Sequence, residues 1–356
     1  MIPQFKVKMA LDAKEIVAEV LDSGFIGQGL RVEEFEDILW KELGSSVRPV
    51  TVNSCTSAID LALDLIGVGP GDEVISTPQT CFASQVGAIH KGATIRWADI
   101  DPITGCMDSN SIERLITDKT KAIIAVNWAG RYCNFTSLKS FGIPVVEDAA
   151  HCWDVFNDNT CERGDYICYS FQAIKFLTTG DGGILIPPKD KEEDARLLRW
   201  YGLDRTKGQS FRCTQNIKEA GFKYQMNDIA AAIGIKNIPH AKESVFDHRK
   251  NSKIFIDRIR NNDIVIPEWD ENGSYWIFSL HVINGRRNEF LEYMKNISIT
   301  VSPVHYRNDE YDCTIEFREF DLPGVNQFSD TQVCIPNGWW LTEDELDYIV
   351  EKINEF

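Results

Sequence analysis

The sequence predicts an α/β fold, with a mostly parallel sheet covered by helices on both faces and a smaller α+β domain after it. Through the first part of the chain, short β-rich runs alternate with helical stretches, which is the pattern of such a sheet. The pattern changes near residue 240, and 356 residues are more than one hydrophobic core usually serves. We therefore expect a large domain over residues 1–240, which includes an N-terminal helical segment, and a small C-terminal α+β domain over residues 241–356.

Helical apolar spacing begins the chain, at residues 11–22 and 31–43, with a glycine-bearing loop between them. Runs rich in β-branched and apolar residues then predict strands at 50–53, 73–77, 94–100, 122–128, 145–147, 166–170 and 183–186, with a helix at 57–67. Further helices are expected at 227–238 and 242–260. The small domain should contain short strands around 275–283 and helices at 288–295 and 342–356.

Composition and charge exclude several classes of protein. Hydrophobic residues make up 43% and charged residues 26% of the chain, which is typical of a soluble globular protein. No apolar run approaches the roughly 20 residues that cross a bilayer, and the first residues lack the apolar segment of a secretory signal. A net charge of −17 argues against a nucleic-acid partner, although a few local cations and backbone N–H groups can still bind an anionic small ligand.

The cysteines and histidines indicate neither disulfides nor a metal site. The ten cysteines occur without CxxC pairs, and none of the six histidines joins a Cys or His cluster with metal-ligand spacing. We therefore expect reduced thiols and a cytoplasmic location.

Two residues point to covalent chemistry. Asp148 follows the buried run 145–147, at the carboxyl end of a strand, where open α/β sheets bind ligands. Lys175 follows the next strand; a lysine that has lost its proton attacks carbonyl carbons. A Schiff-base lysine and an aspartate that pairs with a pyridinium nitrogen are the protein's part of pyridoxal phosphate (PLP) chemistry. His151 could hydrogen-bond the hydroxyl of the cofactor ring, or it could be a structural histidine.

A phosphate could bind where a strand leads into a helix, at residues 51–58. Thr56 and Ser57 would add hydroxyl donors to the free N–H groups of the helix start, where the helix dipole favours an anion. Ser170 could supply a further hydroxyl. An ordinary helix N-cap by Ser54 or Thr56 is the alternative interpretation.

The chain resembles the DegT/DnrJ/EryC1/StrS family in five segments that follow one another in the family's order. These are NSCTSA at 53–58, TCFAS at 80–84, EDAAH at 147–151, SFQAIK at 170–175 and GDGG at 180–183. Members are PLP-dependent aminotransferases that act mostly on nucleotide-linked keto sugars. The resemblance, which runs from Gly24 to the last helix, therefore implies a fold-type-I PLP-dependent transferase.

By position, the resemblance makes Lys175 the residue that binds PLP covalently and acts as general acid and base. It makes Asp148 the partner of the pyridine nitrogen and places His151 near the ring hydroxyl. The phosphate contacts that it implies are Thr56, Ser57 and Ser170. Lys223, in the segment GFKYQM at 221–226, matches a residue that reaches the cofactor phosphate of the neighbouring subunit, which implies a homodimer with shared active sites.

The chain departs from the family's pattern at the residue that stacks on the cofactor ring. That position holds Cys81 instead of an aromatic residue, with Phe82 next to it, and either of them could contact the ring. Other segments carry candidates for binding a sugar or phosphate through stacking and forked hydrogen bonds. These substrate-binding candidates are Trp128, Arg205, His305 and Arg307, with surface loops and ordinary salt bridges as the alternative.

These features predict transfer of an amino group from L-glutamate to a keto sugar, for a surface glycan or a related metabolite. A nucleotide-linked 4-keto-6-deoxy sugar is the expected acceptor, and a keto-cyclitol or a phosphorylated ketone is the alternative. A PLP-dependent sugar dehydratase is a second enzyme hypothesis, although such relatives commonly carry histidine at the position of Lys175. A catalytically silent regulatory protein would have no chemical need for Lys175 and Asp148.

Overall fold

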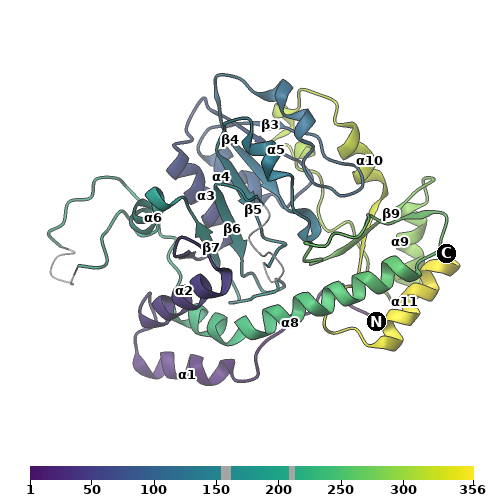
Figure 1. The fold of residues 1–356 in the computed structure, drawn as a ribbon, viewed down its shortest axis with the longest axis horizontal. Helices are drawn as coiled ribbons and strands as arrows, with labels where there is room; N and C mark the ends of the chain where they lie inside the picture. Colours follow the sequence, from purple (N-terminus) through teal and green to yellow (C-terminus); the bar gives the residue numbers. More distant parts are fainter. Residues whose placement is uncertain (154–161, 208–212) are drawn as a thin grey trace.

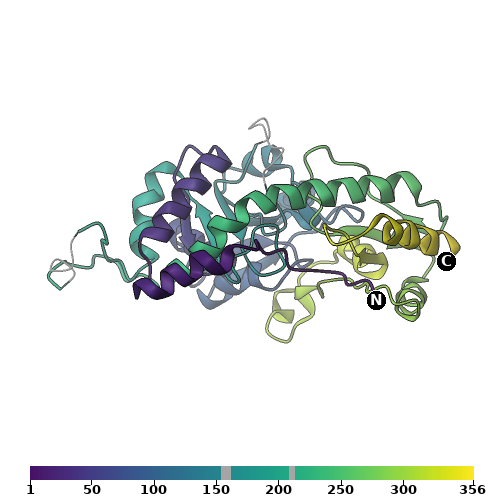
Figure 2. The ribbon, with the colours of Figure 1, turned by 90° about the horizontal axis from the view of Figure 1, so that it is seen from below.

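The computed structural model describes residues 1–153, 162–207 and 213–356. It consists of a large lobe built around a central sheet and a smaller lobe, and both lie along one long helix, α8 (Asp228–Arg258), as Figure 1 shows. Seen from below in Figure 2, α8 runs across most of the length of the molecule.

The central sheet has seven strands in the order β1-β7-β6-β5-β4-β2-β3. Their bounds are β1 Val50–Val52, β2 Glu73–Ser76, β3 Thr94–Trp97, β4 Thr120–Val126, β5 Val145–Asp148, β6 Tyr166–Ser170 and β7 Gly183–Ile186. Only β7 runs antiparallel to its neighbours; the other pairs in this sheet are parallel. Every residue of β1, β2 and β5 is buried, because helices cover both faces, as a parallel sheet requires. The predicted α/β architecture is confirmed.

The helices of the large lobe lie close to their expected positions. They are α1 Ala13–Ser23, α2 Leu30–Leu43, α3 Cys55–Ile66, α4 Ala83–His90, α5 Phe135–Lys139 and α6 Glu192–Leu198. The α3 helix packs against β6 and β7 and buries eight of its residues, because its sequence is apolar on almost every side. The α1 and α2 helices pack against the first part of α8.

The expected helices at 227–238 and 242–260 form the single helix α8, so their separation in the sequence analysis is wrong. Pro239 lies inside α8 and does not end it. Buried positions continue past the proline, with Ala241 and Val245 in the core of the large lobe and Phe255 in that of the small lobe. This burial outweighs the loss of one backbone hydrogen bond at proline. Residue 240 therefore lies within a shared helix, and a domain boundary there stays a prediction.

The small lobe has a three-stranded antiparallel sheet in the order β10-β9-β8. Its elements are β8 Ile264–Val265, β9 Phe278–Val282, α9 Arg287–Asn296, α10 Pro323–Thr331, β10 Gln332–Ile335 and α11 Glu343–Glu355. The start of the chain also lies on this lobe, where Ile2 forms a β-bridge with Ile299, and the two chain ends are near each other in Figures 1 and 2. In the described part of the chain, no helix is long and apolar enough to cross a membrane.

Candidate active site

The carboxyl ends of the parallel strands meet at one edge of the large sheet, where the register places Val126 beside Asp148 and Asp148 beside Cys168. A cavity of about 530 Å³ lies at this edge. The residues that line it include Thr56, Cys81, Asp148, His151, Ser170, Lys175, Trp276 and His305. All of these except Trp276 are residues that the sequence analysis assigns to a cofactor or a substrate. The fold therefore gathers seven predicted site residues from distant parts of the chain around one cavity.

Lys175 lies in the loop after β6, and its Nζ is 3.3 Å from the centre of the Trp276 ring. Burial lowers the pKa of its amine to about 8, although the nearby Asp148 carboxylate acts in the opposite direction. About a tenth of the amine is therefore neutral at pH 7. A neutral amine is the form of lysine that attacks carbonyl carbons.

Asp148 ends β5, and two hydrogen bonds fix its carboxylate. Ser84 Oγ donates to Oδ2 at 2.7 Å, and the Ala150 N–H donates to Oδ1 at 3.1 Å. Burial raises the pKa of Asp148, whereas these two hydrogen bonds lower it. A buried carboxylate with oriented oxygens is suited to pair with a cation such as a protonated pyridine ring.

The N-terminus of α3 reaches the cavity through Cys55 and Thr56. Ser54 is the N-cap, because its Oγ accepts the Ser57 N–H at 3.0 Å, so the capping interpretation of this segment is confirmed. The Ser57 side chain is buried and donates its hydroxyl to Asn53 Oδ1 at 2.6 Å. It does not line the cavity, whereas Thr56 does. Capping occupies one helical N–H and leaves the others at this end for an anion.

The close approach of α3 to the sheet depends on Gly183. A Cβ atom at this position would lie 2.8 Å from the Cys55 nitrogen and 2.7 Å from the Tyr169 oxygen. Any side chain would push the helix end away from the sheet edge. The GDGG segment therefore has a steric role in placing this end of α3.

His151 and His305 approach from the two lobes with nearly parallel rings, whose centres are 5.9 Å apart. His151 Nδ1 accepts the Ala129 N–H at 3.3 Å, so its proton is on Nε2. Burial lowers the pKa of both rings, of His305 to about 4, and both are neutral at physiological pH. His305 Nε2 is buried and has no hydrogen-bond partner in the described protein, so it can bond a ligand in the cavity.

Besides Ser57, three predicted site residues close to this cavity do not line it. Phe82 packs edge-on against Tyr311, with ring centres 5.4 Å apart, which leaves Cys81 as the cavity-lining residue of this pair. Trp128 is fully buried behind His151, with ring centres 5.7 Å apart. Arg307 Nε and Nη2 each donate to the carboxylate of Asp309 at 2.7 Å, and Nη1 donates to Asn326. Substrate binding by Trp128 or Arg307 thus finds no support in this arrangement, because one ring is covered and the other side chain is already paired.

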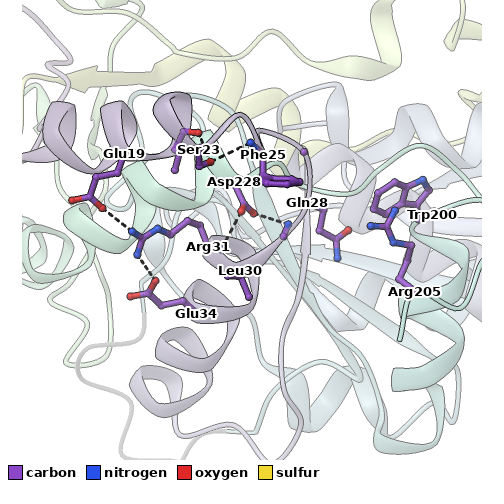
Figure 3. A pocket seen from close by; sticks show the side chains of 13 residues that line it. Glu19, Ser23, Phe25, Gln28, Leu30, Arg31, Glu34, Trp200, Arg205 and Asp228 are labelled. Carbon is purple, nitrogen blue, oxygen red and sulfur yellow. Dashed lines mark hydrogen bonds and ion pairs between the residues drawn. The ribbon is translucent and has the colours of Figure 1, made fainter. Parts of the chain in front are cut away.

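Arg205 and Lys223 also lie away from Lys175, near a second cavity of about 860 Å³ beside the N-terminal helices. The Arg205 guanidinium carbon is 3.5 Å from the centre of the Trp200 ring. In Figure 3 the two side chains lie together, with Gln28 next to Arg205. Lys223 is exposed, and its Nζ is 5.1 Å from the same Trp200 ring. Within one chain, neither cation lines the cavity of Lys175.

Sequence reasoning missed three residues of the site. Ser84 appears only inside a motif, and nothing in the sequence connects it with Asp148. Trp276 comes from the small lobe, and Phe5 from the N-terminal segment stacks on it, with ring centres 5.3 Å apart. Both aromatic residues line the cavity. Only their position in the folded chain identifies them.

The cavity residues fit PLP. A lysine with a lowered pKa, a buried carboxylate, a helix N-terminus and an unpartnered imidazole nitrogen match its aldehyde, ring nitrogen, phosphate and polar substituents. Lys175 and Asp148 would hold the reactive part of the cofactor. Thr56, Ser170 and the start of α3 would hold its phosphate.

Comparisons with known proteins agree with this site. The model of the DegT/DnrJ/EryC1/StrS aminotransferase family matches residues 8–354. The structure of AtS13 from Actinomadura melliaura is 36% identical, with a TM-score of 0.93 over 100% of this chain and 99% of that one. The sugar aminotransferase CalS13 from Micromonospora echinospora is 32% identical, with a TM-score of 0.91 over 100% of both chains. The PLP form of Spr1654 from Streptococcus pneumoniae is 25% identical, with a TM-score of 0.88 over 99% of this chain and 98% of that one.

The family match covers nearly the whole chain, and the similar structures share its fold along their full lengths. PLP, which the cavity residues fit, is the cofactor of one of these structures. The chain therefore belongs to the DegT/DnrJ/EryC1/StrS family and is a PLP-dependent sugar aminotransferase.

Proposed function

We propose that this enzyme transfers the amino group of L-glutamate to the keto group of a nucleotide-linked 4-keto-6-deoxy sugar. The reaction would take place in the cytoplasm and supply an amino sugar for a surface glycan or a related metabolite. The observation that carries the proposal is that Lys175 and Asp148 line the same cavity, with the lysine pKa lowered by burial to about 8. Such an amine can both hold a carbonyl compound and move a proton near neutral pH.

When bound, PLP supplies an electron sink for the electrons released at the substrate carbon. Asp148 would hold the positive charge of the ring nitrogen by opposite-charge stabilisation. Once freed, Lys175 Nζ would take a proton from the carbon that bears the amino group and return it during the second half of the reaction. His151 Nε2–H would donate a hydrogen bond to the ring hydroxyl. Trp276 and Phe5 would cover the cavity and exclude water.

A homodimer is part of the proposal. The surface around the second cavity carries the exposed apolar residues Phe25 and Leu30, which are 82% and 80% exposed. Arg205 lines the same cavity, and Arg205 and Lys223 both approach the Trp200 ring. A second copy of the chain would cover these apolar side chains. It would also bring the two cations to the cavity of the other subunit, where an anionic cofactor and a sugar nucleotide need positive charge.

Subunit complementation tests the shared site. Lys175→Ala and Lys223→Ala homodimers should both be nearly inactive, and mixing after partial unfolding and refolding should restore about a quarter of the wild-type activity by random pairing. Activity that stays at the level of the separate variants would contradict shared sites. Light scattering of the wild type reports the dimer directly, and a monomer would contradict it.

The visible spectrum of the purified protein tests the reaction. A yellow protein whose colour disappears with L-glutamate and returns with a keto sugar would support the proposal. Lys175→Ala should abolish this cycle, whereas the exposed Lys14→Ala serves as a matched control and should retain it. The panel of acceptors should contain nucleotide-linked 4-keto-6-deoxy sugars, a keto-cyclitol and a phosphorylated ketone. A return of colour with only one of the last two would reject the proposed acceptor.

A further inference from the structure

Trp276 contacts the amine of Lys175 face-on. The Nζ atom lies 3.3 Å from the ring centre, closer than the other lysine amines near aromatic rings in the described chain. An aromatic face attracts an ammonium group because of the ring quadrupole, and the attraction is stronger where water is excluded. Trp276 is only 3% exposed and Lys175 is half-buried, so water has limited access to this contact.

Neighbours on several sides hold the Trp276 ring in place. It stacks with Phe5 and with His151, with ring centres 5.3 Å and 4.2 Å away and interplanar angles of 24° and 27°. Its Nε1–H donates to the Ile174 carbonyl at 2.9 Å. Because Ile174 precedes Lys175, this hydrogen bond fixes the ring relative to the backbone that carries the lysine. Turning the ring away would break the bond and both stacks.

The backbone before Trp276 is also constrained. Tyr275 has a φ of 55°, in the left-handed region that residues other than glycine rarely adopt. The Ser274 N–H donates to the Gly130 carbonyl at 2.9 Å, and a Cβ atom at Gly130 would lie 2.8 Å from the Tyr275 nitrogen. The small lobe thus reaches the large lobe through a tight backbone contact at this point. Strain of this kind persists where the surrounding structure imposes it, commonly at active sites.

From this geometry we propose that Trp276 is a positioning residue, which holds the Lys175 amine on its ring face whenever the amine is not attached to the cofactor. The inference rests on the proposed role of Lys175. In each half-reaction the amine is displaced and must then move a proton, yet lysine has a long and flexible side chain. A ring face that binds the free amine restricts the amine to positions beside the reacting carbon. Less conformational entropy of the lysine side chain is then lost when the proton is transferred.

Other ionisable groups face the same amine and act on its charge. These are Asp148, Cys55, Cys81 and Cys152, which favour the protonated form, and His151 and His305, on whose pKa values the lysine in turn acts. The test must therefore change the ring and leave these groups in place.

Replacement of Trp276 by Phe and by Leu separates the ring face from apolar bulk. Both changes remove the Nε1 hydrogen bond and leave similar space, but only Phe retains an aromatic face. Trp40→Phe, an exposed position on α2, is the control. In the cofactor-free protein, the pH midpoint for attachment of PLP to Lys175 should be higher in Trp276→Phe than in Trp276→Leu, by about half a unit. The single-turnover rate of the amine-loaded form with keto acid should be about fivefold higher in the Phe variant, at unchanged keto-acid affinity.

Equal midpoints and equal single-turnover rates in the Phe and Leu variants would overturn the inference. If Trp276→Leu does not fold, as judged by circular dichroism, the comparison moves to Trp276→Phe against the wild type. The Phe variant should then show the lower midpoint and the slower turnover, because indole binds cations better than benzene. The proposed function has its own test, which is loss of the yellow colour in Lys175→Ala. If that colour survived, the role of Lys175 would fail, whereas indistinguishable ring variants would reject only the role of Trp276.

Discussion

The lowered pKa of Lys175 can be measured through the rate at which its amine reacts with a carbonyl compound. The pKa of about 8 lies about 2.5 pH units below the 10.5 of an ordinary lysine. At pH 7 the neutral fraction of the Lys175 amine is therefore about 300-fold larger than that of an ordinary lysine. In the cofactor-free protein, attachment of PLP or a small aldehyde to Lys175 should therefore accelerate about tenfold per pH unit below pH 8 and level off above it. Mass spectrometry of the reduced adduct measures the rate at this one residue.

Asp148→Asn tests in which direction the Asp148 charge moves the pKa of Lys175. The Asp148 carboxylate is the largest of the influences that raise the pKa of Lys175, whereas burial lowers it. Without that negative charge the pKa should fall further, so the reaction midpoint should move below that of the wild type. The catalytic turnover should nevertheless decrease severely, because the partner of the ring nitrogen is lost. A wild-type midpoint near 10.5, or a midpoint in Asp148→Asn at or above that of the wild type, would refute the reasoning.

Three further substitutions test the hydrogen bond that orients Asp148 and two polar contacts that stabilise the large lobe. Ser84→Ala removes the donor to Asp148 Oδ2 and should slow turnover about tenfold with little change in the KM for the amino donor, whereas full turnover would show that this bond does not matter. Glu36→Gln should lower the free energy of unfolding by about 3–5 kcal/mol, measured with urea, because the buried Arg199 loses its ion pair at 2.7 Å; a loss below 1 kcal/mol would be contrary to expectation. Asp228→Ala removes the carboxylate that accepts N–H groups at the start of α2 and so caps this helix from α8. The free energy of unfolding should fall by about 1–2 kcal/mol in the same urea assay, and an unchanged urea midpoint would contradict this capping role.

The acid dependence of the Glu36 cluster has a definite sign. The neighbouring arginines lower the pKa of the buried Glu36 from 4.5 to about 2, against the effect of burial. A depressed carboxylate pKa gives stability that is present above the unfolded value and is lost as the carboxylate is protonated. The stability that this pair contributes should therefore decline between pH 4.5 and pH 2 in the wild type. Glu36→Gln should show a smaller decline over that interval, measured by urea unfolding at each pH.

The sequence determined the fold class and the chemical centre of this protein. The alternation of buried strands with helices is a local pattern, and it predicts a parallel sheet because such strands must be covered on both faces. Lys175 and Asp148 could be predicted because Asp148 lies at the carboxyl end of a strand and Lys175 in the loop after the next strand, and strand ends of a parallel sheet converge at one edge. The single α8 was predicted as two helices because the sequence pattern changes near residue 240. Pro239, which by itself favours a helix end there, is overridden by burial of the flanking turns.

Only the tertiary structure decided which side chains complete the cavity. Ser84 reaches Asp148 across 64 positions of sequence, and Trp276 and His305 arrive from the other lobe. Trp128 and Arg307 show the converse, because their residue types suit a sugar site but packing buries one ring and pairs the other side chain. Contacts of this kind depend on how whole elements pack, and no local pattern records them. The sequence therefore identified the reacting groups, whereas packing between the lobes determined what surrounds them.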